Sequence, residues 1–290
     1  MKNIDIIQKM VLGTAQFGMN YGIANAIGKP TKAEVFDILD VAWENGIRRF
    51  DTAPGYGSEA LLGDFILANG IQDEAIVFTK IPSLDGASCY QKSIRTSLET
   101  SLNNLSCSVD VFFFHNPADS CLLLTDPHFF ENLLRDYPLS TLGVSVYETK
   151  EVESLSGYSI ELAFQFPFNV LDRRFEKISL PKRKRYARSV FLQGLLASRN
   201  ELRPDTPKEI HNLQKEYHNR LAEYDLDPVS VAVSFVAHND AVDYFLFGVD
   251  SAKQLQDILE LEPYEQKDMA FLDILRVNTP EKWLDPRQWN

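Results

Sequence analysis

The chain has little of what would mark several common classes of protein. Its three cysteines, Cys89, Cys107 and Cys121, show no Cys-x-x-Cys spacing, which excludes a disulfide framework and indicates reduced thiols. No apolar run approaches the roughly 20 residues of a membrane-spanning helix. Residues 1–10 lack the long apolar region of a signal peptide. We therefore expect a cytoplasmic protein without a membrane role.

Positive charge is also scarce. The chain has 29 Lys and Arg against 41 Asp and Glu, for a formal net charge of -12. Such a balance argues against general binding to nucleic acid, although a local cationic site can still hold an anionic cofactor. The histidines do not combine with flanking carboxylates into a metal-ligand set, so no metal site is expected.

Apolar residues make up 44% of the chain, which is ample for a sizeable core. Short runs rich in β-branched and aromatic residues alternate with longer amphipathic stretches, as in buried parallel strands separated by helices. One of these helices should begin at a capping box of Thr31 and Glu34 and end at Gly46. The spacing of Ser251 and Gln254 also fits a capping box, at the start of the last helix. The expected strands are Val11–Phe17, Arg48–Thr52, Ile76–Lys80, Val109–His115, Leu142–Val146, Leu162–Phe166, Ser189–Leu192 and Tyr244–Val249.

Eight strand–helix units predict an α/β fold, a (β/α)8 TIM barrel that forms a single domain over residues 1–290. A doubly wound sheet is the alternative, but no Gly-x-Gly-x-x-Gly motif follows the first expected strand. In a barrel of this kind the active site lies at the carboxyl ends of the strands.

Ionisable residues follow three successive expected strands. Asp51, Lys80 and His115 each end an apolar run, and Tyr56 lies in the loop after Asp51. A free tyrosine has a pKa of about 10, and a neighbouring ammonium favours the phenolate and lowers that value. The four residues can therefore form a proton-transfer site with Tyr56 as general acid. Each alone also has a structural explanation, such as a turn cap or a solvated strand end, and only their joint position favours catalysis.

Longer segments around these residues resemble the aldo-keto reductase family. Phe50 to Gly63 is similar to the family signature, Phe78-Thr79-Lys80 to its lysine segment, and Phe114 to Pro117 to its histidine segment. The resemblance implies that Asp51, Tyr56, Lys80 and His115 are the catalytic tetrad. Gly13 to Gly18 resembles the first-strand segment of bacterial members found near surface-sugar biosynthesis genes, which implies a sugar-derived substrate.

The resemblance also implies a nicotinamide cofactor, NADPH with NADH possible. It assigns cofactor binding to Ser145, Gln165, Arg188, Phe191, Gln193, Gly194, Gly248, Ser251 and Gln254.

Two departures from the family pattern bear on this assignment. Arg188 stands where many members carry an aromatic that stacks on the nicotinamide ring, with Phe191 or Trp289 as alternatives. Gly248 and Gln254 stand where cations usually bind the adenosine 2′-phosphate, with acidic Asp250 between them.

The sequence therefore predicts an NAD(P)H-dependent oxidoreductase that reduces a small-molecule aldehyde or ketone to an alcohol. Arg173 and Arg174 follow the sixth expected strand and would suit an anionic group on the substrate. Two other functions stay open. One is a nicotinamide-binding regulatory or assembly protein on the same fold with little turnover. The other is a Schiff-base aldolase with Lys80 as nucleophile, which a neighbouring carboxylate disfavours because it keeps the lysine charged.

Overall fold

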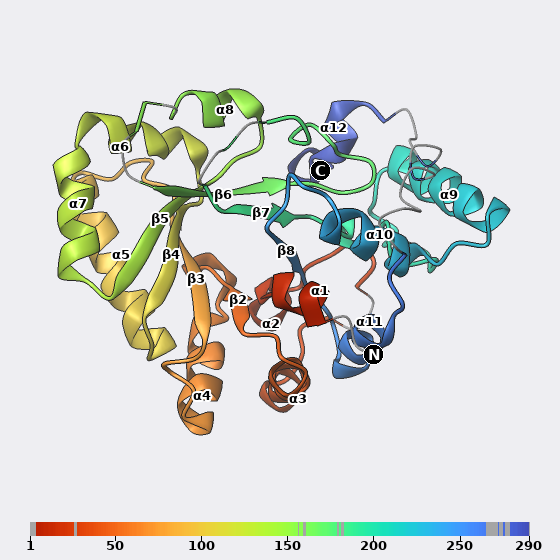
Figure 1. The fold of residues 1–290 in the computed structure, drawn as a ribbon, viewed down its shortest axis with the longest axis horizontal. Coiled ribbons are helices and arrows are strands. Elements are labelled where there is room, and N and C mark those ends of the chain that lie inside the picture. Colours follow the sequence, from red (N-terminus) through yellow and green to blue (C-terminus); the bar gives the residue numbers. More distant parts are fainter. Residues whose placement is uncertain are drawn as a thin grey trace.

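The chain folds into a closed barrel of eight parallel strands with helices around it, as Figure 1 shows. The computed structural model describes residues 4–25, 28–155, 157–158, 161–178, 180, 183–264, 272, 275 and 279–289. Each strand pairs with the next in parallel, and the last pairs back onto the first, so the sheet has no free edge. This is the (β/α)8 barrel that the sequence predicts. Whether residues 1–290 form one domain stays a prediction.

The strands are short, and their carboxyl ends meet at one mouth. They are β1 (Met10–Gly13), β2 (Arg49–Asp51), β3 (Ile76–Ile81), β4 (Val109–Phe114), β5 (Leu139–Ser145), β6 (Leu162–Pro167), β7 (Arg185–Arg188) and β8 (Tyr244–Phe247).

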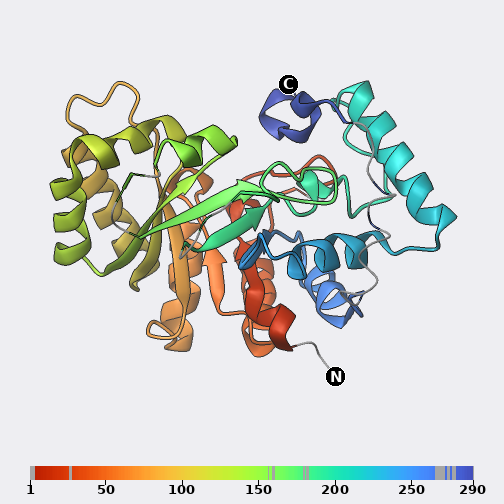
Figure 2. The ribbon, with the colours of Figure 1, turned by 45° about the horizontal axis from the view of Figure 1, so that its top comes forward.

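Helices surround the barrel, and α1 and α12 lie at its opposite ends (Figure 2). Between β6 and β7 the described residues form turns and no helix. None of the described helices is long and apolar enough to cross a membrane. The α-helices are α1 (Ile4–Lys9), α2 (Ala15–Gly18), α3 (Lys32–Glu44), α4 (Glu59–Asn69), α5 (Tyr90–Leu105), α6 (Leu122–Thr125), α7 (Pro127–Asp136), α8 (Thr149–Glu153), α9 (Lys208–Glu223), α10 (Pro228–Ala237), α11 (Ala252–Glu260) and α12 (Glu281–Leu284). Short 3-10 turns are η1 (Pro54–Tyr56), η2 (Pro117–Cys121), η3 (Leu192–Gly194) and η5 (Pro286–Gln288).

The barrel interior is filled by a layer of apolar side chains. The rings of Phe78, Phe113 and Tyr186 pack edge to face, with centroids 4.9–6.2 Å apart. Because side chains alternate along a strand, the residue two positions further on points into the barrel as well, one layer nearer the mouth. The layer above the aromatic one consists of polar residues and glycine, namely Asp51, Lys80, His115, Ser145, Gln165, Arg188 and Gly248.

Several expected strand boundaries differ from the structure, most of all those of the seventh and first strands. The seventh strand is Arg185–Arg188 rather than Ser189–Leu192, since Ser189 and Leu192 have φ of 58° and 45°, which a strand cannot accommodate. Arginines at both ends of β7 hide its two apolar residues from a search for apolar runs. The first strand stops at Gly13, because Ala15–Gly18 turns into α2.

The start of α3 agrees with the capping box predicted from the sequence, whereas the start of α11 differs from its predicted capping box in one hydrogen bond. Thr31 and Glu34 form the expected capping box at the start of α3. At α11, Ser251 accepts a hydrogen bond from the Gln254 N–H, but Gln254 Oε1 accepts from the N–H of Asp250 rather than of Ser251. The side chain of Gln254 thereby fixes the loop that carries Asp250.

Gly143→Ala should destabilise the barrel, because a Cβ there would lie 2.4 Å from Cδ1 of the Phe113 ring. Overpacking of this kind costs about 1–3 kcal/mol. Chemical denaturation of both proteins measures the loss. Gly157→Ala is the matched control, since nothing lies within 4 Å of that Cβ position. If the two variants are equally stable, the aromatic layer can rearrange around the added methyl group without loss of free energy of unfolding.

Candidate active site

A buried ion pair lies at the centre of the barrel mouth. Lys80 Nζ donates to Asp51 Oδ1 at 2.6 Å and to the carbonyl oxygen of Thr52 at 2.9 Å. Lys80 is 1% exposed and Asp51 4%. The second oxygen of Asp51 accepts from Gln165 Nε2 at 2.8 Å. Although burial favours a neutral lysine, Asp51 and Tyr56 outweigh it and raise the pKa of Lys80. The lysine therefore stays charged.

Tyr56 sits over this pair at the end of η1, with Lys80 Nζ 4.9 Å from the centroid of its ring. Burial raises the pKa of Tyr56 above its ordinary value, and the opposing effect of Lys80 does not overcome it. Lys80 does lower the pKa of Tyr56, as the sequence predicts, but burial, which the sequence does not show, has the larger effect in the resting site. Tyr56 keeps its proton, which a general acid needs before reaction.

His115 follows β4 and faces Tyr56 edge to face, with ring centroids 6.1 Å apart. Its ring is exposed to the cavity. The protein packed around it and the charge of Lys80 lower the pKa of His115 to about 4. The imidazole is neutral near pH 7, so it can donate one hydrogen bond without adding charge.

Local packing fixes the loop that carries Tyr56. The hydroxyl of Ser58 bonds the hydroxyls of Thr14 and Thr52 at 2.8 and 3.0 Å, and all three residues are fully buried. Gly18 approaches from α2, where a Cβ would lie 1.8 Å from the Tyr56 carbonyl oxygen. Only glycine permits this approach, so the first-strand segment and the Tyr56 loop form one unit.

These residues open into a cavity of about 750 Å³. The structure brings the four expected catalytic residues together at one part of its wall. The expected cofactor residues Ser145, Gln165, Arg188, Phe191, Gln193, Gly194, Gly248 and Gln254 also line it. Ser251 does not line it and caps α11 instead.

The pair Ser145 and Gln165 suits a carboxamide. They are paired in register at the ends of β5 and β6 and are 2% and 1% exposed. Among the described residues Ser145 has no side-chain hydrogen bond, and Gln165 uses only its amide nitrogen. One hydroxyl and one amide oxygen are thus left at the cavity wall for the oxygen and nitrogen of a nicotinamide carboxamide, so the site fits the cofactor that the sequence implies.

Arg188 ends β7 and lies in the wall beside them. Its Nη2 donates to the Val146 carbonyl oxygen at 3.1 Å, and its Cζ lies 3.9 Å from the centroid of the Tyr147 ring. Trp289 does not line the cavity. It is 5% exposed, and its indole N–H donates to the carbonyl oxygen of Trp283.

The part of the cavity between α11 and the start of α10 is acidic. Asp227, Asp250 and Asp257 line it, and Asp250 accepts from Asn25 Nδ2 at 3.1 Å. Lys253 pairs with Asp257 on the exposed side of α11. Gln16 lies against Gly248, where a Cβ would come within 2.0 Å of its Nε2.

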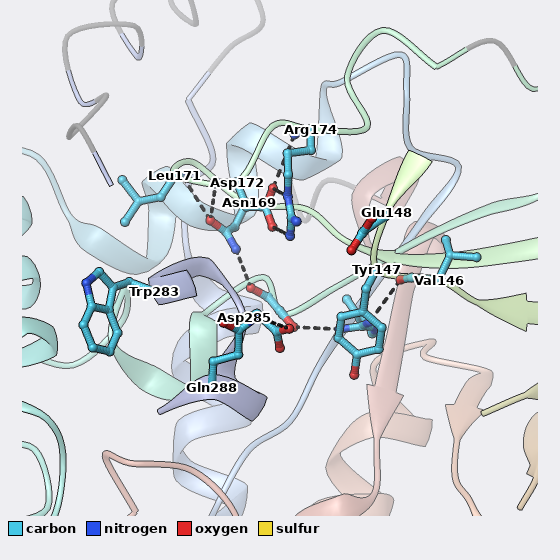
Figure 3. A network of polar contacts seen from close by, with 12 residues as sticks. Val146, Tyr147, Glu148, Asn169, Leu171, Asp172, Arg174, Trp283, Asp285 and Gln288 are labelled. Carbon is cyan, nitrogen blue, oxygen red and sulfur yellow. Dashed lines mark hydrogen bonds and ion pairs between the residues drawn. The ribbon is translucent and has the colours of Figure 1, made fainter. Parts of the chain in front are cut away.

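The sequence interpretation missed several lining residues. Tyr21 comes from the loop after α2, Tyr147 follows β5, and Arg287 comes from the C-terminal tail. Arg287 Cζ lies 3.1 Å from the centroid of the Tyr147 ring. Figure 3 shows Tyr147 in one polar network with Asp285 and Gln288 of the tail. The tail is distant in sequence from the strands, so no local pattern could have placed it here.

Arg173 and Arg174 do not line the cavity, contrary to the expectation that they face a substrate. Arg174 forms two bonds to the buried carboxylate of Asp172 at 2.8 and 2.9 Å (Figure 3). Arg173 donates to the carbonyl oxygens of Val170 and Leu272. In the part of the chain that the structure describes, no group of three or more His, Cys, Asp and Glu residues is placed to hold a metal.

A buried lysine–carboxylate pair, a phenol and a neutral imidazole thus meet at the mouth of a (β/α)8 barrel. The model of the aldo/keto reductase family matches residues 9–276. The chain belongs to the aldo/keto reductase family.

Curated relatives and solved structures agree with this. Aflatoxin B1 aldehyde reductase member 2 of Rattus norvegicus is 30% identical over 182 residues, 59% of this chain and 47% of that protein. The chain thus spans about half the length of this relative. The aldo-keto reductase YhdN of Bacillus subtilis is 24% identical over 80% of this chain and 81% of its own. The holo structure of an aldo-keto reductase from Bacillus halodurans has a TM-score of 0.73 at 18% identity, covering 97% and 95% of the two chains.

Asp51→Asn should strongly destabilise the protein, because it leaves the buried Lys80 ammonium without a carboxylate. Breaking a buried pair costs about 3–5 kcal/mol. Urea denaturation of the wild type and the variant measures it. Asp64→Asn is the control, since Asp64 pairs with Lys32 at an exposed site and such pairs contribute about 0–1 kcal/mol. If both variants lose the same small amount of stability, the buried charge of Lys80 must be stabilised by a group other than Asp51.

Proposed function

We propose that the chain is an NAD(P)H-dependent oxidoreductase that reduces an aldehyde or ketone to an alcohol. The carbonyl compound, the reduced cofactor and one proton would give the alcohol and the oxidised cofactor. The reduced cofactor, when bound, would supply the hydride. The observation that carries the proposal is the convergence of Asp51, Lys80, Tyr56 and His115 on one part of the cavity wall. Membership of the aldo/keto reductase family supports the same class of reaction.

In this proposal Tyr56 is the general acid. Its hydroxyl gives a proton to the carbonyl oxygen as that oxygen becomes an alkoxide. The phenolate left behind is stabilised by the Lys80 ammonium beneath its ring, which Asp51 keeps charged. His115 is neutral and donates a hydrogen bond that orients the carbonyl. General acid catalysis of this kind contributes about 10²–10⁴ in rate.

The same cavity would hold the cofactor. We propose that Ser145 and Gln165 bind the carboxamide, that Arg188 lies beside the nicotinamide ring, and that Phe191, Gln193, Gly194 and Gly248 line the path toward α11. The acidic part of the cavity would then face the adenosine end. There Asp250 has no cation paired with it among the described residues, and its pKa is raised chiefly by burial.

The two other functions are less well supported. A Schiff-base aldolase needs a neutral Lys80, whereas Asp51 and Tyr56 hold its pKa above the usual range. A regulatory protein that only binds the cofactor would have no need of a phenol, an ammonium and an imidazole placed together. A sugar-derived substrate and a cytoplasmic location stay predictions.

Tyr56→Phe should lower kcat for aldehyde reduction by about 10²–10⁴-fold, because it removes only the proton that the general acid supplies. Cofactor binding, followed by tryptophan fluorescence, should be nearly unchanged. Tyr137→Phe is the control, since that hydroxyl bonds Glu99 on the surface. Near wild-type turnover by Tyr56→Phe would remove Tyr56 from the mechanism, and cofactor binding without turnover by the wild type would favour a regulatory protein.

Discrimination between the two cofactors should be weak. The 2′-phosphate of NADPH usually gains roughly 1.5–3 kcal/mol per charge-assisted hydrogen bond, but Gly248 and Gln254 carry no charge and Asp250 repels it. We expect fluorescence titration to give dissociation constants for NADH and NADPH within about tenfold. Asp250→Asn should shift the ratio of the two dissociation constants toward tighter NADPH binding. Asp240→Asn, in the turn before β8, should leave that ratio unchanged. A preference for NADPH of several hundredfold would reveal an unrecognised cation, with Arg199 and Lys253 the first to test.

A further inference from the structure

One arginine in the cavity wall has no counter-ion among the residues that the structure describes. The Lys and Arg residues that line the cavity are Lys80, Arg188 and Arg287. Lys80 is paired with Asp51, and Arg287 is paired with Asp285 at 2.7 Å. No carboxylate of the described residues lies within ion-pair distance of Arg188. Because His115 is neutral near pH 7, the catalytic part of the cavity has a net positive charge.

The guanidinium of Arg188 is held in place but poorly satisfied. Stacking on Tyr147 and the bond to the Val146 carbonyl oxygen fix its plane. Its Nη1 reaches the Ser189 hydroxyl only at 3.5 Å, and its Nε is buried without a partner. A half-buried cation with unused donors costs free energy in the free protein, and an anionic ligand would recover it.

Tyr147 and the tail explain why Arg188 is fixed in this position. Cζ of Arg188 lies 3.9 Å from the centroid of the Tyr147 ring, and Cζ of Arg287 lies 3.1 Å from it. Two guanidinium groups cannot both fit so close to one face of a ring, so they lie on opposite faces. Asp285 neutralises Arg287, and Arg188 is left as the cation available to a ligand.

Arg188 also lies near the reacting groups. It lines the same cavity as Tyr56 and His115, and its Nη2 bonds the carbonyl oxygen of Val146, the residue after Ser145. Tyr21 lines the same cavity. It is 38% exposed, but the protein packed around its hydroxyl raises its pKa to about 12, so the hydroxyl remains a hydrogen-bond donor. An oxyanion beside Arg188 could therefore accept from a planar guanidinium and a phenol, close to the carbonyl position.

We propose that the substrate of this enzyme is a carbonyl compound that carries a carboxylate or phosphate group, and that Arg188, assisted by Tyr21, is the residue that selects it. This inference rests on the proposed carbonyl reduction. The residue that binds the substrate anion is then Arg188 at the end of β7. Arg173 and Arg174, which the sequence suggested for this role, lie outside the cavity.

The first test compares aldehydes of one size. Wild type should reduce 4-carboxybenzaldehyde or 4-formylphenyl phosphate with a kcat/KM at least about tenfold above that of neutral 4-formylbenzamide, as one charge-assisted contact allows. The anionic aldehyde with the higher kcat/KM identifies the group, carboxylate or phosphate, that the site selects. Arg188→Met should remove most of this preference, through KM rather than kcat, and Tyr21→Phe should reduce it several-fold. Arg135→Met, which removes an exposed arginine of α7 paired with Asp136, should keep it.

The second test needs no turnover. Calorimetry would compare 4-(hydroxymethyl)benzoate with 4-(hydroxymethyl)benzamide, both alcohols, in the presence of saturating reduced cofactor, where no net reaction occurs. Wild type should bind the benzoate at least about tenfold more tightly, and Arg188→Met should bind both within about threefold. If wild type reduces no aldehyde but shows this difference, the proposed function fails and the anion site stands.

Three results would overturn the inference. Wild type could treat the charged and neutral compounds alike in both tests. Arg188→Met and Tyr21→Phe could both retain the full preference, which would assign it to another group. Arg188→Met could weaken NADH and NADPH binding tenfold or more while the preference for the anion stays, which would show that Arg188 serves the cofactor diphosphate instead.

Discussion

The structure of the site depends on one buried ion pair. A lysine that is 1% exposed needs a carboxylate, and Asp51 provides it at 2.6 Å from the neighbouring strand. The aromatic layer of Phe78, Phe113 and Tyr186 closes the barrel below the pair and excludes water from that side. In this surrounding the attraction between the charges is stronger than in water, and so is the effect of Lys80 on Tyr56. Gln165 holds the other oxygen of Asp51, so the strand-six glutamine is part of the same unit.

The cavity above this pair differs in charge from one part to the other. Near the strand ends, the charge without an ion-pair partner among the described residues is the cation of Arg188. Between α10 and α11 the charges at the wall are the carboxylates of Asp227 and Asp250. An elongated ligand therefore meets opposite charges along its length. The first feature favours an oxyanion near the reacting carbonyl, and the second disfavours an additional phosphate at the adenosine end of a dinucleotide. Neither follows from Asp51, Tyr56, Lys80 and His115, the proposed catalytic residues, whose charges sum to zero.

Much of the site could be predicted because strand ends in a barrel have a fixed place. Lys80 lies near the end of β3, His115 follows β4 and Asp51 ends β2, so topology alone brings them to one mouth. The prediction failed where other forces decide. Arg185–Arg188 forms β7 because Tyr186 fills the barrel interior, although charged residues surround it. The pKa of Tyr56 is raised because burial outweighs a lysine that the sequence shows only as a nearby charge. Ser251 is a helix cap, a role that its spacing to Gln254 already indicated.

The sequence by itself determined the (β/α)8 barrel, the family and the convergence of Asp51, Tyr56, Lys80 and His115. Each of these depends on patterns of a few residues, such as alternation along a strand or the segment from Phe50 to Gly63. Only the tertiary structure decided which charges are paired. Arg174 is neutralised by Asp172 two residues away, Arg287 by Asp285, and Arg188 by nothing among the described residues. Whether a charge has a partner depends on how the fold orients the side chains, even for residues two positions apart, because a Coulomb interaction depends on distance and burial rather than on sequence separation.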